Sequence, residues 1–145
     1  MSNVKSYAAY ATSTRLPVLM DGTTFVEMIL LKTYMPEMFE ASMRTNARYY
    51  VFDFSFENAM NRLTTQQREF IQETLDKLSG KHYKVIKAEN DIPIKDEECR
   101  FVSAAMEFQK NIPHMTMQVS SARIWELFRT AQCQVKLDTF DLDLL

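Results

Sequence analysis

Glycine is scarce in this chain, which has 145 residues but only two glycines, Gly22 and Gly80. Average usage of about 7% would give roughly ten. The two lie too far apart for a phosphate-binding loop, which needs closely spaced glycines ahead of Lys-Ser or Lys-Thr. A dinucleotide-binding fingerprint and a Gly-x-Ser-x-Gly nucleophile elbow are excluded for the same reason.

Cysteine and histidine are equally scarce. The chain has Cys99, Cys133, His82 and His114, and no two are close enough in sequence to form the ligand pairs of a structural zinc site. We therefore expect no metal, no cofactor and no catalytic residue. Cys99 as a nucleophile with His114 as its base remains a minor alternative. Two cysteines make no disulfide framework and fit a reducing compartment.

Long apolar runs are also missing. No stretch approaches the roughly 18 apolar residues that span a bilayer, and the N-terminus lacks an apolar signal core. We therefore expect no membrane partner and a cytoplasmic location, which would be the host cytoplasm if the protein is viral. The net charge of -2 predicts no strong bulk attraction to nucleic acid or to anionic membranes.

The composition is otherwise that of one folded domain. Hydrophobic residues make up 46% of the chain and charged residues 25%, which is the ordinary globular mixture. The length is typical of a single domain that buries a substantial core. Ten methionines with so little glycine indicate helix-rich, adaptable packing and leave the impression of a viral or phage accessory protein.

Helical patterns recur along the chain, several with start and stop signals. Pro36 favours the start of a new helix, and Thr64 with Gln67 can form a capping box that restarts a long helix midway. The helices we expect begin at Thr23 or Thr24, cover about 36–47 and 57–78, run from Asp96 towards Pro113, and begin again at Ser120 or Ser121.

Strands alternate with these helices. The clearest is Tyr49 to Phe56, with aromatic residues on both faces. His82 to Ala88 and residues 115–119 predict two more strands, and Val135 with Leu137 begins a fourth. We expect a single compact α+β domain over residues 1–137, with three to four strands separated by helices in a mixed sheet and helices largely on one face.

Acidic residues provide one candidate site. Asp53 lies in the aromatic strand, where partial burial would raise its pKa and let it act as an acid. The alternative, which we favour, is a pair with Arg48 or exposure to solvent. Asp96, Glu97 and Glu98 form a run that the helix dipole alone explains.

A basic region surrounds the turn from the long helix into the second strand. In one interpretation, the lysines of this region hold the phosphates of a nucleic acid while the ring of Tyr83 stacks on a base. The alternative is a solvated helix end and an edge strand protected by lysine. The residues are Lys77, Lys81, His82, Tyr83, Lys84 and Lys87.

Residues 138–145 form an acidic and hydrophobic tail, in which Phe140, Leu142 and Leu144 alternate with aspartates. Apolar groups gain nothing from exposure to water, so some surface should bury them. One interpretation makes the tail the final amphipathic strand of the protein's own sheet. The other makes it a docking peptide for another protein.

The segment Phe140-Asp-Leu-Asp-Leu-Leu145 resembles the C-terminal peptides by which bacterial and phage replication and late-transcription proteins bind sliding clamps. It lacks the leading glutamine of the common bacterial version, and similar strings occur in clathrin-box peptides and acidic activation segments. The resemblance implies that the partner is a sliding clamp or related machinery. It further implies apolar anchors and one acidic spacer, namely Phe140, Leu142, Asp143, Leu144 and Leu145.

We therefore expect a non-enzymatic interaction or regulatory protein that binds a macromolecular partner in part through this tail. The first alternative is a small nucleic-acid-binding module that uses the basic region 77–87. The second is a carboxylate-based enzyme. Steep salt dependence of binding would favour the first alternative, and a perturbed carboxylate in a concave pocket would favour the second.

Overall fold

The computed structural model describes residues 7, 10, 15–88 and 95–131. The strands are β1 (Leu16–Met20), β2 (Ala47–Phe52), β3 (Tyr83–Ile86) and β4 (Thr116–Gln118). The helices are α2 (Gly22–Tyr34), α3 (Pro36–Arg44), α4 (Asp53–Asn61), α5 (Thr65–Lys77) and α6 (Glu97–Asn111), followed by a helix over residues 122–131.

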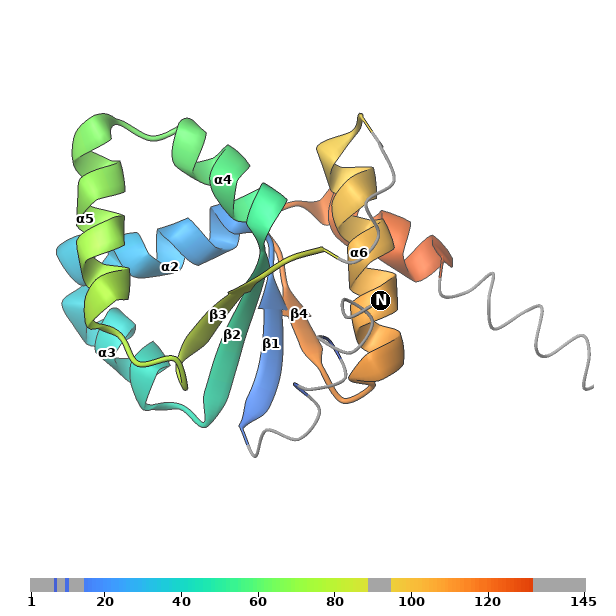
Figure 1. Cartoon of the computed structure of the whole chain (residues 1–145), viewed down its shortest axis with the longest axis horizontal. Coiled ribbons are helices and arrows are strands. Elements are labelled where there is room, and N and C mark those ends of the chain that lie inside the picture. The colour runs from blue at the N-terminus through green and yellow to red at the C-terminus, as the bar shows by residue number, and fades with distance from the viewer. Residues whose placement is uncertain (1–6, 8–9, 11–14, 89–94, 132–145) are drawn as a thin grey trace, which may run out of the picture.

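The four strands form one sheet in the order β3-β2-β1-β4. Every pairing is parallel: Val18 of β1 lies opposite Tyr49 of β2 and opposite Thr116 of β4, and Tyr49 in turn lies opposite Tyr83 of β3. Because each connection between parallel strands must cross over the sheet, every strand in the described chain is followed by at least one helix (Figure 1).

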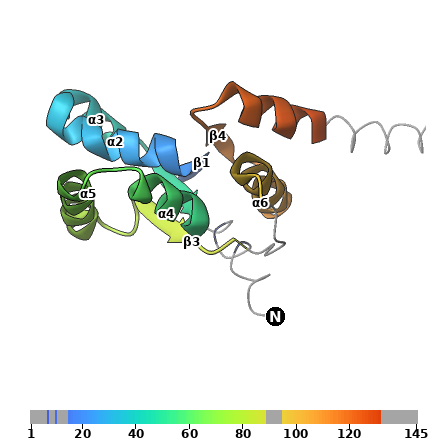
Figure 2. The same ribbon diagram turned by 90° about the horizontal axis from the view of Figure 1, so that it is seen from above.

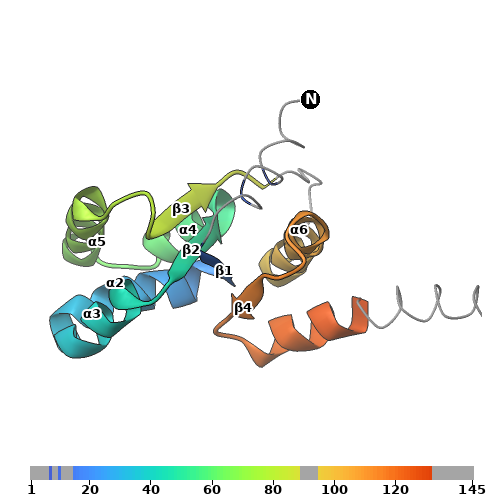
Figure 3. The same ribbon diagram turned by 90° about the horizontal axis from the view of Figure 1, so that it is seen from below.

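Helices cover both faces of the sheet, which gives three layers. Seen from above, α2 to α5 lie on one side, and α6 with the helix over residues 122–131 lies on the other (Figure 2). The view from below shows the same division (Figure 3). The sheet is therefore buried on both faces, as is usual for all-parallel sheets.

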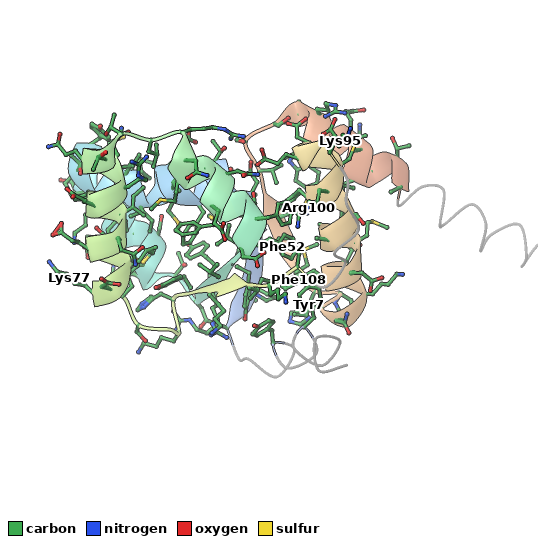
Figure 4. The ribbon with its side chains drawn as sticks, turned by 45° about the horizontal axis from the view of Figure 1, so that its top comes forward. Tyr7, Phe52, Lys77, Lys95, Arg100 and Phe108 are labelled. Atoms are coloured by element: carbon green, nitrogen blue, oxygen red, sulfur yellow. The ribbon has the colours of Figure 1, made fainter. Side chains whose placement is uncertain are left out.

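Alternation along the strands supplies two hydrophobic cores. Val18 and Val51 face α2, in what we call the α2-side core, which includes Phe25 and Ile71. Leu19 and Tyr50, which alternate with them along β1 and β2, face the α6-side core. There the Phe108 ring lies 5.4 Å from that of Tyr7 and 6.2 Å from that of Phe52 (Figure 4).

Several predicted elements are confirmed. Pro36 starts α3, and Thr64 with Gln67 forms the predicted capping box at the start of α5. Asp96 caps α6, and the strands over β3 and β4 lie where they were expected. The compact α+β class is likewise confirmed, with one sheet and helices between its strands.

Two details of the predicted architecture were wrong. The sheet is parallel throughout its described strands rather than mixed, and helices cover both faces rather than mainly one. The short, half-polar pattern of β4 suggested a one-sided sheet. Among the described strands, however, β4 lies at the edge of the sheet, so it shows this pattern while the central β2 is buried on both faces.

The prediction of a strand through Phe56 was also wrong, because the chain turns into α4 at Asp53. Phe54 and Phe56 mimic strand alternation but lie in a helix, where residues two apart point about 200° away from each other. Phe54 therefore joins the α6-side core while Phe56 packs against the α2-side core.

The sequence analysis missed β1, which lies in the interior of the sheet between β2 and β4. Its five residues include Pro17, and proline is uncommon in the interior of a sheet. The first helix begins differently as well: Asp21, directly after β1, caps α2 in place of Thr23 or Thr24. The predicted strand at Val135 and Leu137, and the tail 138–145, lie outside the described residues.

Candidate functional site

The order of the strands creates a natural ligand position between β1 and β4. Connections from β1 run through α2 on one face, whereas α6 leads into β4 on the other face. In open parallel sheets, ligands bind in the crevice at the carboxyl ends of the strands where the direction of connection reverses. A cleft of about 340 Å³ lies at this place, lined by Asp21, Thr23, Ser55, Arg62, Asp96, Glu97, Glu98, Phe101, Ser120 and Ile124.

Asp21 is the most deeply buried acid of this cleft, with only 6% of its surface exposed. Its Oδ1 accepts hydrogen bonds from the backbone and hydroxyl of Thr24, which caps α2. It also accepts from the Ser120 backbone at 3.2 Å, while Oδ2 accepts from the Ser120 hydroxyl at 2.7 Å. Asp21 therefore joins the end of β1 to the segment that follows β4.

Gly22 brings α2 directly against α4. Its backbone N–H donates to the Ser55 hydroxyl at 2.7 Å. A Cβ on Gly22 would lie 1.9 Å from the carbonyl oxygen of Ser55, so only glycine fits this contact. One of the two glycines of the chain thus lies where the first turns of α2 and α4 touch, beside the cleft.

Arg123, in the helix over residues 122–131, binds two of the acids that line the cleft. Its guanidinium donates to both carboxylate oxygens of Asp96, at 3.1 and 2.9 Å, and to Glu98 at 2.7 Å. The hydrogen bonds from Arg123, joined by backbone donors, lower the pKa of Asp96 to about 2. The pKa of Glu98 is lowered first by Arg123 and then by Ser121, so both carboxyls stay ionised at neutral pH and are poor proton donors.

Glu97 has its own cation, since its carboxylate lies 2.6 Å from Arg62 at the end of α4. Each of the four acids that line the cleft thus accepts a hydrogen bond from the protein itself. Among residues 7, 10, 15–88 and 95–131, no group of three or more His, Cys, Asp or Glu residues is placed to hold a metal ion. The acids of the cleft are therefore bound by donors of the protein itself.

We favoured a pair with Arg48 or exposure to solvent for Asp53; the pair does not form, and the residue is half-buried. It lies in the first turn of α4, and its Oδ1 accepts from the backbone of Phe54 at 2.7 Å and of Ala88 at 3.4 Å. Arg48 instead donates to the carbonyl of Gly80 and the hydroxyl of Tyr50. Asp53 therefore has a structural role at the start of a helix.

The structure separates Cys99 from His114. Cys99 is in the first turn of α6, and His114 lies beyond the end of this helix, just before β4. A helix of 15 residues is about 22 Å long, so the two side chains are at opposite ends of the sheet. The minor alternative of a cysteine nucleophile with this histidine as base is wrong.

The basic region lies at the end of α5 and along β3, which is at the edge of the sheet that the described strands form. Its lysines are exposed, as expected for either interpretation. Tyr83 points inward: its ring lies 6.0 Å from that of Phe25, and its hydroxyl donates to the Leu75 carbonyl. The domain's own contacts thus hold the ring that was expected to stack on a base.

The far end of α2 presents an unusual apolar surface, which we call the corner patch. It consists of Tyr34, Met35 and Met38, whose exposed fractions are 68%, 50% and 50%. The turn from α2 into α3 brings them together, and the Met38 backbone donates to the Met35 carbonyl at 3.0 Å. Large apolar side chains are usually covered, so this cluster is a candidate interaction surface.

A hollow of about 540 Å³ adjoins the corner patch, between the end of α2 and the start of α5. Apolar groups of Leu30, Tyr34 and Phe70 line it together with uncharged polar side chains. The remaining lining residues are Thr33, Thr64, Gln66 and Gln67. No ionisable group other than the Tyr34 phenol lines this hollow, so it suits an apolar side chain better than a phosphate.

Methionines in predicted helices, such as Met35, Met38 and Met43, are a sequence signal for an adaptable contact surface. The structure exposes Met35 and Met38, but Met43 packs against the α2-side core. Tyr34 and the hollow were missed, because α5 approaches α2 only in the folded chain. The tail residues 140–145 lie outside the described part of the chain.

Comparisons with protein-family models, with curated protein sequences and with solved structures each found no match to this chain. A search of the described helices for one long and apolar enough to cross a membrane found none.

Proposed function

We propose that this is a non-enzymatic protein that binds another protein through the corner patch and through the tail residues 140–145, in a cytoplasm. The observation that carries the proposal is the exposure of Tyr34, Met35 and Met38 beside a hollow without acidic or basic residues. The partner is a protein that inserts an apolar side chain into this hollow.

The chemistry of the corner patch supports this type of partner. Methionine is flexible and polarizable, so it adapts to different partner shapes, and tyrosine provides a large contact area with little loss of conformational entropy. Apolar anchors that fill pockets supply most of the binding energy of protein interfaces. A nucleic acid would need cations to hold its phosphates, and the lining of the hollow has none.

The tail supplies the second part of the proposal. Its likeness to clamp-binding peptides makes a sliding clamp, or a related nucleic-acid-processing machine, the partner to test first. A peptide at the end of a chain can reach a groove on a partner while the domain contacts a neighbouring surface. Two linked contacts strengthen each other through their effective concentration.

The test measures binding of the purified full chain to purified bacterial and phage sliding clamps by fluorescence anisotropy, and repeats it with single-site variants. We expect Met38→Glu and Leu144→Glu each to weaken binding at least tenfold. Leu16→Gln is the matched control, because Leu16 is 61% exposed but lies at the start of β1, away from the corner patch. Equal binding by all four proteins, or none by the wild type, would overturn the clamp assignment.

If no clamp binds, the same variants separate a docking surface from a chance apolar patch. Proteins captured from a lysate are identified by mass spectrometry, purified and titrated directly. A partner that binds the wild type and Leu16→Gln equally but loses affinity for Met38→Glu supports the corner patch. If every captured partner binds these proteins equally, the corner patch is not a docking surface.

A second candidate function is a carboxylate-based enzyme, and one observation favours it. Four carboxyls line a cleft at the place where parallel sheets bind ligands, and Asp21 is buried there. A divalent cation would have to displace Arg62 or Arg123 to reach these groups. Titration with Mn²⁺, followed by paramagnetic broadening of the Asp96 and Ser120 amide signals, tests a metal-dependent form of this enzyme: broadening that Asp21→Asn abolishes supports it, and unchanged signals remove it.

A further inference from the structure

We propose that a second hollow beside α2, which we call the Glu27 hollow, binds a small organic cation: a guanidinium or alkylammonium group on a short apolar stem. Its volume is about 570 Å³, and β1, β2, β4, α2 and the end of α3 line it. It lies on a different flank of α2 from the hollow at the corner patch, so the inference does not depend on the protein partner proposed above. The Glu27 hollow uses the α2 residues Thr24, Glu27, Met28 and Leu31, and the other hollow uses Leu30, Thr33 and Tyr34.

The Glu27 hollow lies where α2 covers β1 but not β4. Met20 of β1 pairs with Gln118 of β4, and partners in a parallel ladder point to the same face of the sheet. Met20 is buried in the α2-side core, whereas Gln118 is exposed. The last turn of α3 adds a further wall, with Ala41, Ser42 and Thr45. The result is a concave site on the sheet between two helices.

The inner side of this hollow is apolar. Met20 and Met28 are only 2% and 7% exposed, and Leu31 adds a third large apolar side chain. Small-molecule sites have volumes of roughly 300–1,000 Å³, and the Glu27 hollow falls in this range. A short aliphatic stem would therefore gain free energy by leaving water here.

The hydroxyl groups at the end of α3 already donate their protons within the protein. Ser42 donates to the Met38 carbonyl at 3.1 Å. Thr45 and Tyr49 both donate to the Ser42 carbonyl, at 2.9 and 3.0 Å. A hydroxyl whose proton is already donated can only accept a further hydrogen bond. The end of α3 also attracts cations through its helix dipole, and the Arg15 guanidinium donates to the Thr45 carbonyl there at 3.0 Å.

Glu27 supplies the negative charge of the hollow. It is exposed, no lysine or arginine lines the hollow, and no cation in the described part of the chain forms an ion pair with it. Thr24, on the same side of α2, donates its proton to Asp21 and is therefore an acceptor as well. Apart from the Gln118 amide, every polar side chain of the lining can only accept, so a ligand must bring both N–H donors and positive charge.

The first test is a titration of the full chain with n-butylguanidinium, followed by the backbone amide signals in NMR spectra. The signals of residues 24–31 and 42–45 are expected to shift. n-Butylurea has nearly the same shape without the charge, and we expect it to bind about fivefold more weakly or worse. Tetramethylammonium has the charge without N–H donors and should not shift these signals. Equal binding of n-butylurea, or shifts confined to other parts of the chain, would overturn the proposal.

The second test repeats the titration with Glu27→Gln, which keeps the shape of the side chain and removes its charge. We expect the dissociation constant of n-butylguanidinium to rise about fivefold. Glu57→Gln is the matched control, because Glu57 is an exposed acid of α4 that does not line the hollow, and it should bind like the wild type. An unchanged constant in Glu27→Gln, or an equal rise in both variants, contradicts the assignment. Urea midpoints verify that both variants stay folded.

A third titration distinguishes a free ligand from the side chain of another protein. An acetylated and amidated tripeptide with a central arginine presents the same guanidinium on a peptide backbone. If the hollow is a small-molecule site, n-butylguanidinium binds at least as tightly as this peptide. Tighter binding of the peptide would assign the hollow to a partner's arginine and overturn the small-molecule proposal.

Discussion

The two ends of α2 differ in whether the side chains there are bound by the protein itself or lie open to solvent. At the N-terminal end, Asp21 uses both carboxylate oxygens on Thr24 and Ser120, and Gly22 leaves no space for a Cβ. At the C-terminal end, Tyr34 and Met35 lie open to solvent beside a hollow. The first arrangement is typical of a region that maintains the fold, and the second of a region that contacts something else.

The comparison also separates two kinds of polar cluster. The cleft at the carboxyl ends of the strands occupies the expected ligand position, but its acids are bound by Arg62, Arg123 and Ser120. Its position in the fold is that of a ligand site, and its hydrogen bonds also connect α2, α4, α6 and the segment after β4.

The largest effect is expected at the N-terminal end of α2. Gly22→Ala should lower the free energy of unfolding by about 3 kcal/mol, because the new methyl group meets the immobile backbone of Ser55. Gly80→Ala is the matched control: a Cβ there has no neighbour within 4 Å, and the change should stay within about 0.5 kcal/mol. Urea denaturation of both variants measures the difference. Similar losses of stability in the two variants would show that the contact between Gly22 and Ser55 is not the cause of the destabilisation.

A smaller loss is expected when Asp21 is replaced. Asp21→Ala removes the cap of α2, which contributes about 1 kcal/mol, and leaves the Ser120 donors without this partner, for a total near 2 kcal/mol. Asp21→Asn keeps an acceptor oxygen and should cost less. Urea midpoints of the two variants check this order, and a loss for Asn equal to that for Ala would mean that the charge, rather than the hydrogen bonds, matters.

The ion pairs of Arg123 should make stability depend on pH in the acid range. The pKa of Asp96 is lowered from 3.8 to about 2, and that of Glu98 is lowered from 4.5. Folded pKa values below the unfolded ones stabilise the native state above about pH 4.5, and this contribution is lost as pH falls towards 2.

Thermal denaturation of the wild type and Arg123→Ala measures this contribution. The difference in Tm between them should be largest near pH 6 and should shrink between pH 4.5 and 2. Arg129→Ala, which removes an exposed pair with Glu126 within one helix, should show no such trend. A difference that is constant with pH would contradict the role of Arg123.

The smallest effect on stability is expected at the corner patch. Met35→Gln and Met38→Gln replace half-exposed side chains and should change the free energy of unfolding by less than about 0.5 kcal/mol. Phe39→Gln, next to Met38 in α3, replaces a side chain that is 3% exposed and should cost about 3 kcal/mol or more. Urea denaturation compares all three; a large loss for Met35 or Met38 would show that they support the fold.

Local signals along the chain predicted much of the fold. The capping box of Thr64 and Gln67, the proline at the start of α3 and the cap at Asp96 each act within one helical turn. Such signals are readable because their partners are three or four residues away. β1 was missed because five residues with a proline resemble a loop, and its identity as a strand depends on β2 and β4 at its sides.

The sequence by itself determined where most helices and strands lie and which common chemistries the glycine count excludes. Only the tertiary structure decided the parallel pairing, the separation of Cys99 from His114, the inward position of Tyr83 and the pairing of Asp21 with Ser120. The reason is the separation along the sequence over which each interaction acts. Helix signals act between neighbours, whereas Asp21 and Ser120 are 99 residues apart, and only the folding of the whole chain brings them into contact.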